Sequence, residues 1–105
     1  MKMTLEQVNT ICMEMISNAG EGRALVYEAL DAVNAKDYTA AAAKLTEAEE
    51  HLAEAHRIQF EELMAPQSDG TELAFSMLLL HAMDLTMVAT SEHDMLKSIV
   101  TAHLQ

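Results

Sequence analysis

A stretch of 17 residues from Leu73 to Ala89 constrains the fold more than any other feature, because the helix that it predicts is apolar on every side. Its clearly polar residues do not gather on one outward face; they are Ser76, His81, Asp84 and Thr86. A membrane span explains it poorly, since a span needs about 20 residues and this stretch carries two ionisable groups. A helix that is apolar all round has to be covered all round by protein.

The helix that contains this stretch, expected from about Thr71 to the vicinity of His103, has two apolar seams. The first follows a 4-3-4 spacing and suits packing on the other helices of the same chain; it consists of Phe75, Leu79, Ala82 and Thr86. The second is heptad-like and consists of Met77, His81, Asp84, Val88 and Met95. The chain offers no fourth helix to cover the second seam, so the pattern predicts self-association.

A first long helix is predicted between Leu5 and Val33, where apolar residues recur every three or four positions. Gly20 and Gly22 interrupt this pattern within "NAGEGR", and each glycine costs up to about 1 kcal/mol inside a helix. The segment lacks the Gly-Lys-Ser/Thr ending of a phosphate-binding loop. The two glycines therefore predict a bend or the close approach of another helix.

A second helix is predicted to begin after Asp37, a favourable N-cap, and to continue to Met64 without glycine or proline. Residues 65–70, "APQSDG", then predict a turn or a mobile loop. With the third helix, this gives an all-α fold class, an antiparallel three-helix bundle that forms one domain over residues 1–105.

Charge and cysteine content exclude several kinds of partner and site. Seventeen acidic residues against six Lys and Arg give a net charge of −11, which argues against nucleic acid as a partner. Cys12 is the only cysteine, so no intramolecular disulfide is predicted, and its apolar setting indicates a buried position. The N-terminal segment "MKMTLEQVNT" has no secretory pattern, and a cytoplasmic location without membrane insertion is expected.

His81 and Asp84 are the candidate site residues, one helical turn apart in apolar surroundings. A reachable His81 is a nitrogen nucleophile or a metal ligand, whereas an enclosed one is a hydrogen-bonded core histidine. Asp84 needs a cation, a hydrogen-bond donor or a proton. If copies of the third helix meet at an axis, the converging Asp84 carboxylates would be offset by a hard cation such as Mg²⁺.

The other histidines carry weaker signals. None of the five has an acidic residue three positions before it, so the pattern of four-helix di-iron sites is missing. His51 is expected on an exposed polar face, and His93 and His103 are expected to be solvated or to cap the polar end of the third helix. His56 and Gln59 share a face and could reach the His81 region or a subunit boundary, which is a packing hypothesis.

Three segments together resemble a known family. "ISNAGEGRALVYEALDAVNAKDYTAAAAKL" resembles a small-Gly-x-x-Arg segment followed by Gly-Asp-Phe-x-x-Ala, and "EAHRIQFEEL" is similar to Glu-Ala-His-x-x-Gln-Thr. "HAMDLTM" resembles His-Ala-Gln-Asp-His-Leu-Met. The matching positions are Gly20, Arg23, Asp37, Ala41, Glu54, Ala55, His56, Gln59, His81, Ala82, Asp84 and Met87. The chain thus resembles, over nearly its whole length, the lactose-, cellobiose- and chitobiose-specific enzyme IIA of the bacterial phosphoenolpyruvate-dependent sugar phosphotransferase system.

The resemblance implies a fold, an activity and a metal. Three such subunits would assemble into a parallel homotrimer of nine helices. His81 would accept a phosphoryl group from the phosphocarrier protein HPr and pass it to a cysteine of the sugar-specific enzyme IIB, during uptake of a β-disaccharide through the membrane component IIC. One Mg²⁺ per trimer would be shared by three copies of Asp84.

Three residues depart from the family pattern. Met83, Leu85 and Phe60 stand where the family has Gln, His and Thr, respectively. The missing glutamine removes a donor to the phosphoryl oxygens, and such a bond to a charged group contributes about 1.5–3 kcal/mol. The alternative hypothesis is that the chain is a non-catalytic, helical, trimeric interaction or regulatory module that has lost phosphotransfer. The sugar itself cannot be read from this chain, because the membrane component binds it.

Overall fold

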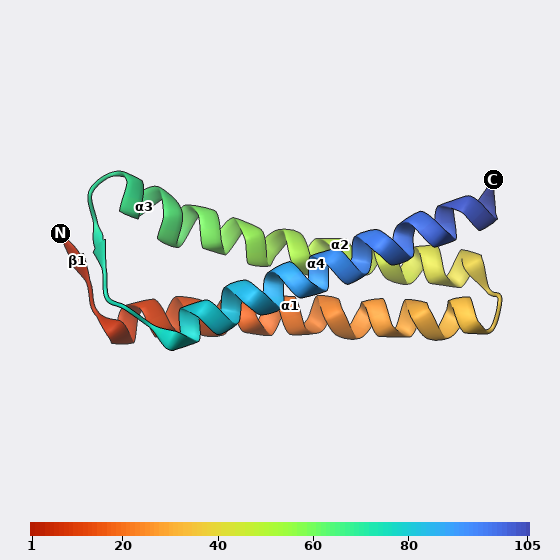
Figure 1. The fold of residues 1–105 in the computed structure, drawn as a ribbon, viewed down its shortest axis with the longest axis horizontal. Helices are drawn as coiled ribbons and strands as arrows, with labels where there is room; N and C mark the ends of the chain where they lie inside the picture. The colour runs from red at the N-terminus through yellow and green to blue at the C-terminus, as the bar shows by residue number, and fades with distance from the viewer.

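A computed structural model describes residues 1–105, and three long helices dominate it, as predicted. The elements in chain order are β1 (Lys2–Met3), α1 (Leu5–Asn34), α2 (Tyr38–Ile58), the π-helical segment η1 (Gln59–Met64), α3 (Ala65–Ser68), β2 (Glu72–Leu73) and α4 (Met77–Leu104). Figure 1 shows α2 returning beside α1 and α4 running obliquely across the pair. The result is an elongated molecule of 52 × 20 × 15 Å in which α4 touches both other helices.

Side-chain caps set the starts of the long helices. At α1, Thr4 forms a capping box: its hydroxyl accepts from the Gln7 amide, and the Gln7 side chain accepts from the Thr4 amide. At α2, the predicted N-cap Asp37 is confirmed, since its carboxylate accepts from the Ala40 amide at 3.1 Å. Ser76 plays the same role for α4, where its hydroxyl accepts from the Leu79 amide at 3.2 Å.

The helical path of the second helix is longer than predicted. It continues through η1 and α3 to Ser68, so the expectation of a break at residue 65 is wrong. Pro66 lies at the start of α3, directly after the π-helical segment η1. The chain reverses only at Asp69 and Gly70, and Gly70 has a φ of 99°, a conformation that favours glycine.

The third helix begins later than predicted, at Met77 and not near Thr71. Glu72 and Leu73 are extended because β2 pairs in parallel with β1, with Lys2 opposite Glu72 and Met3 opposite Leu73. Phe75 therefore lies outside the helix and is 76% exposed, so its placement in the inner seam is wrong. Glu72 and Leu73 pair with a strand from the other end of the chain, and the residues around them do not predict this pairing.

The inner face of α4 fills the groove between α1 and α2. Its buried residues recur at spacings of three and four; they are Ala82, Thr86, Ala89, His93, Leu96 and Val100. Ala82 and Thr86 confirm the predicted inner seam, and Leu79 is partly buried beside them. Cys12 is fully buried as predicted, and burial raises the pKa of its thiol. None of the chain's helices combines the length and the apolar character that a membrane span needs.

The two glycines of α1 have different surroundings, although the helix runs unbroken through both. A methyl group at Gly22 would lie 2.8 Å from two carbons of the buried Leu52 side chain on α2. A methyl group at Gly20 would meet nothing within 4 Å. The predicted close approach is thus confirmed at Gly22, where the absence of a side chain lets α1 and α2 come together.

This difference provides a matched pair of substitutions. Gly22→Ala is expected to lower the free energy of unfolding by about 1–3 kcal/mol, because the methyl group overpacks the contact with Leu52. Gly20→Ala is expected to raise it by roughly 0.5–1 kcal/mol, since alanine is the better helix former and the position is open. Urea unfolding followed by circular dichroism measures both. Equal stability of the two variants would contradict the proposed helix contact.

Candidate functional site

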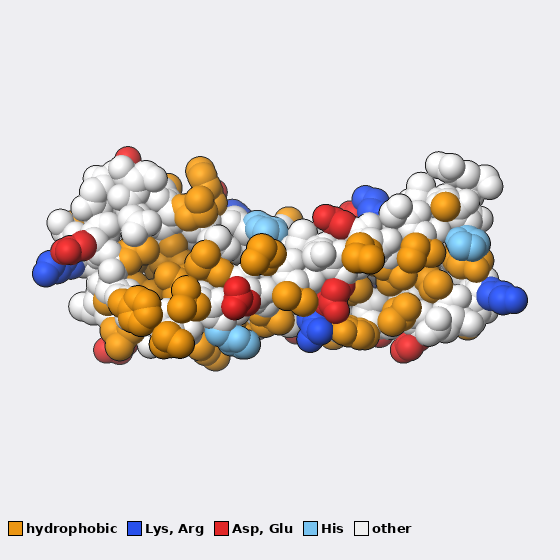
Figure 2. Space-filling model, in the orientation of Figure 1, with side chains coloured by type: hydrophobic (Ala, Val, Ile, Leu, Met, Phe, Trp, Pro, Cys, Tyr) orange, Lys and Arg blue, Asp and Glu red, His pale blue; other side chains and the backbone are white.

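The second seam of α4 is left uncovered by the chain. Met77 and Met95 are each 69% exposed, and Val88 is 45% exposed. Figure 2 shows hydrophobic side chains along this side of the molecule, separated by single acidic and histidine side chains. The exposed large apolar residues of α4 are Met77, Leu80, Met83, Met87, Val88, Met95, Ile99 and Leu104. A surface of this kind marks an interaction site.

His81 and Asp84 both lie exposed on this seam, on successive turns. His81 is the only histidine without a polar partner in the chain. Each of the other four has a polar contact: His51 with Glu21, His56 with Thr90, His93 with Glu49 and Asp94, and His103 with the Ile99 carbonyl. Its imidazole nitrogens are thus available to a reaction partner.

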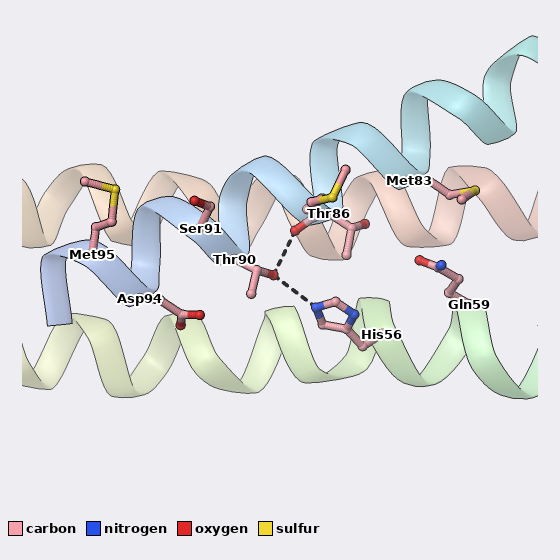
Figure 3. A pocket seen from close by; sticks show the side chains of 9 residues that line it. His56, Gln59, Met83, Thr86, Thr90, Ser91, Asp94 and Met95 are labelled. Carbon is pink, nitrogen blue, oxygen red and sulfur yellow. Dashed lines mark hydrogen bonds between the residues drawn. The ribbon is translucent and has the colours of Figure 1, made fainter. Parts of the chain in front are cut away.

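A pocket of about 490 Å³ lies between α4 and the second helical path, α2 with η1 (Figure 3). It is on the flank of α4 opposite to His81. It is lined by His56, Gln59, Met83, Thr86, Met87, Thr90, Ser91, Asp94 and Met95. Because side chains turn by about 100° per residue, His81 and Met83 point to opposite flanks of α4. The pocket and His81 are therefore separated by the exposed ridge that carries Asp84.

Hydrogen bonds in this pocket indicate which ring nitrogen of His56 donates. The Thr90 hydroxyl donates its single proton to the Thr86 carbonyl at 2.8 Å, and the same oxygen lies 3.0 Å from His56 Nε2. His56 must then donate through Nε2, which leaves Nδ1 as an acceptor in the neutral ring. Gln59 reaches only the Met64 sulfur, at 3.9 Å, so its amide has donor capacity to spare.

His93 contradicts its prediction, because it is buried and not a solvated or capping residue. Its Nδ1 lies 2.9 Å from Asp94, and its Nε2 lies 3.2 Å from a carboxylate oxygen of Glu49 without forming a hydrogen bond. Glu49 also accepts from Lys97 at 2.7 Å, and this bond lowers the Glu49 pKa. His93 lies four residues after the buried Ala89 and so continues the buried stripe of α4. This spacing could have predicted that His93 is buried.

The remaining histidines agree with their predictions. His51 is half-exposed and lies 3.7 Å from Glu21. His103 is exposed in the last turn of α4, where its Nδ1 lies 3.0 Å from the Ile99 carbonyl and its ring stacks on Tyr38.

A second set of polar contacts joins α4 to α1, and the sequence pattern did not predict it. Arg23 Nε donates to Glu92 at 2.7 Å, and the Tyr27 hydroxyl donates to the same carboxylate at 3.0 Å. The bond from Arg23 lowers the pKa of Glu92. With the bond from Lys97 to Glu49 on the α2 side, polar bonds hold α4 from both flanks and fix which face it turns outward.

Within one chain, no three His, Cys, Asp or Glu side chains converge in a way that could hold a metal ion. Asp84 is a single carboxylate on an exposed ridge. Its oxygens suit a hard cation such as Mg²⁺, but a site made from them requires further copies of the chain.

Comparisons with known proteins agree with each other. The family model "PTS system, Lactose/Cellobiose specific IIA subunit" matches residues 10–104. The lactose-specific EIIA component of Staphylococcus aureus is 33% identical over 98 residues, which cover 93% of this chain and 94% of that protein. The lichenan-specific phosphotransferase enzyme IIA component of Bacillus subtilis is 33% identical over 95 residues, covering 90% and 86% of the two chains.

Solved structures show the same relationship. The crystal structure of PtcA from S. mutans superposes with a TM-score of 0.92 at 30% identity, covering 98% of this chain and all of that one. The cellobiose-specific enzyme IIA of the phosphotransferase system from Bacillus anthracis superposes with a TM-score of 0.84 at 28% identity, covering 96% and 90%.

The lowered pKa of Glu92 gives a pH prediction. A carboxyl whose folded pKa is lowered stabilises the fold above its ordinary pKa of 4.5, and this contribution is lost as the pH falls through the folded value. Glu92→Gln is therefore expected to lower stability at pH 7 and to flatten the loss of stability on acidification. Urea unfolding between pH 7 and pH 3 measures this, with the exposed Glu47→Gln as control. Parallel pH profiles for wild type and Glu92→Gln would contradict it.

Proposed function

The chain belongs to the lactose/cellobiose-specific IIA family of the sugar phosphotransferase system, and we propose that it carries phosphoryl groups on His81. In this proposal, phosphorylated HPr is the donor and a cysteine of an enzyme IIB is the acceptor. The observation that carries the proposal is the state of His81: it is exposed and unpaired, while the four other histidines have polar partners.

The chemistry requires little beyond a reachable imidazole and correct positioning. The lone pair of an unprotonated ring nitrogen, Nε2 by the family resemblance, forms a bond to phosphorus while the bond from phosphorus to HPr breaks and its electron pair stays on HPr. In the second transfer, a cysteine thiolate of IIB forms the new bond to phosphorus, and His81 leaves as the neutral imidazole. The histidine is regenerated, and one phosphoryl group has moved from HPr to IIB.

We further propose that three copies assemble around the second seam of α4. The seam exposes Met77, Val88 and Met95, which a subunit interface would remove from water. In a parallel trimer with this seam at its axis, three Asp84 carboxylates converge, and a shared Mg²⁺ would offset their repulsion through oxygen ligands. A hard divalent cation suits this donor set, and its role would be to hold the subunits, with no part in phosphoryl transfer.

A second candidate is a trimeric interaction module without phosphotransfer. Met83 and Leu85 favour it, because both positions lack the polar side chains that the family carries there. A histidine sealed from solvent would have strengthened this alternative. His81 is exposed in the chain, which supports the phosphocarrier as the leading proposal.

Phosphorylation tests the leading proposal directly. Incubation with phosphoenolpyruvate, enzyme I and HPr is expected to add one phosphoryl group per chain, detected as an increase in intact mass under conditions that preserve phosphohistidine. His81→Gln is expected to abolish it. His103→Gln, which changes an exposed histidine on the same helix, is expected to leave it intact. A wild-type protein that stays unmodified would favour the interaction module instead.

The trimer and the metal have a separate test. Asp84→Leu is expected to remove any bound divalent ion while preserving or raising trimer stability, because packed apolar groups replace three converging charges. Metal content by elemental analysis and mass by light scattering measure the two effects. Asp31→Leu, at an exposed position of α1, serves as control. Folded monomers of Asp84→Leu would overturn the proposed axis.

A further inference from the structure

The π-helical segment η1 exposes two large apolar side chains to water. Phe60 is 59% exposed and Met64 is 49% exposed, whereas Leu63 beside them is buried. Figure 2 shows hydrophobic side chains at the upper edge of the molecule, where Figure 1 draws the end of the second helical path. Phe60 stands where the family pattern has threonine. The chain thus carries an aromatic surface of its own that its fold does not use.

The charges around this pair are mostly negative. Arg57 is the only Lys or Arg between residues 45 and 70, and it already donates to both Glu54 and Glu61. Glu62 adds a third carboxylate, so these side chains leave two negative charges in excess. Interfaces place complementary charges around an apolar centre. A protein surface that fits the η1 pair therefore has an apolar pocket with Lys or Arg side chains at its rim.

The pair faces away from the pocket beside it. Gln59 lines that pocket together with Met83, whereas Phe60 does not (Figure 3). In the proposed trimer, the His81 flank of each α4 faces the Met83 flank of the next copy. Because Met83 is only two residues from His81, about 3 Å of helix rise, η1 of that next copy stands level with His81. Phe60 then lies on the outer side, from which a reaction partner has to approach.

We propose that Phe60, with Met64 beside it, is the contact by which this chain selects its phosphoryl acceptor, an enzyme IIB whose docking surface has an apolar pocket with a basic rim. This inference rests on the proposed function and adds a specificity-determining residue to it. A residue that departs from the family pattern suits the acceptor, because the acceptor is the partner that differs with the sugar. Phe60 touches no reacting atom, and the bonds made and broken are those of the proposed transfer.

Transfer kinetics distinguish the two partners of the chain. The probe is the enzyme IIB of the source organism that accepts phosphoryl groups fastest from the wild-type chain. Phe60→Thr, which introduces the family residue, is expected to raise the KM for this IIB about 5- to 30-fold, because buried aromatic anchors contribute on this scale. The KM for phosphorylated HPr is expected to stay within about twofold of the wild-type value.

The chain offers a matched control for the aromatic substitution. Phe75 is its other phenylalanine and is even more exposed. Phe75→Thr makes the same chemical change outside η1, and it is expected to leave both KM values at their wild-type levels. Circular dichroism of both variants is expected to match the wild type, since neither ring belongs to the core.

The basic rim has its own pair of variants. Glu62→Lys reverses a carboxylate close to Phe60 and is expected to raise the KM for IIB several-fold, with a smaller effect at high salt. Glu47→Lys changes the net charge equally at an exposed position about 22 Å away along the helical path. It is expected to have little effect, because this distance exceeds the screening length.

The outcomes separate this inference from the function beneath it. An unchanged KM for IIB in Phe60→Thr, or equal rises for IIB and HPr, would overturn the role of Phe60 while leaving the phosphocarrier in place. Equal effects of Glu62→Lys and Glu47→Lys would overturn the basic rim. A wild type that accepts no phosphoryl group from HPr, or passes none to any IIB, would reject the proposed function and this inference together.

Discussion

The need to cover α4 on all sides is the constraint on which the rest of the structure depends. Two helices of the same chain bury one face of it, along the stripe from Ala82 to Val100. The small residues at Ala82 and Ala89 let α4 lie close in the groove between α1 and α2. The opposite face keeps Met77, Val88 and Met95 exposed, and the hydrophobic effect favours removing it from water through further protein contact.

Polar contacts on both flanks decide which face of α4 is turned outward. Glu92 binds Arg23 and Tyr27 of α1, whereas His93 and Lys97 contact Glu49 of α2. Hydrophobic burial alone fixes a rotation loosely, because apolar residues surround the first half of the helix. The hydrogen bonds of Glu92 and Lys97 are directional and lie in its second half. They turn outward the seam that carries His81 and Asp84, one histidine free of partners beside one carboxylate.

The two flanks of α4 have different chemistry. His81 points from one flank among apolar neighbours, and Gln59 and His56 offer donors from a pocket on the other. An isolated chain keeps these groups apart.

Periodicity and capping chemistry let the sequence by itself determine the three helices, the N-cap at Asp37, the burial of Cys12, the close approach at Gly22 and the uncovered seam that carries His81 and Asp84. These features depend on residues near one another in the chain. Only the tertiary structure decided that Glu72 and Leu73 pair with the N-terminal strand, which exposes Phe75, and that His93 is buried against Glu49. It also joined Arg23 to Glu92 and Gln59 to the pocket beside Met83. Each of these contacts links residues far apart in the sequence, and a one-dimensional pattern does not specify which distant partner satisfies a polar group or an open strand edge.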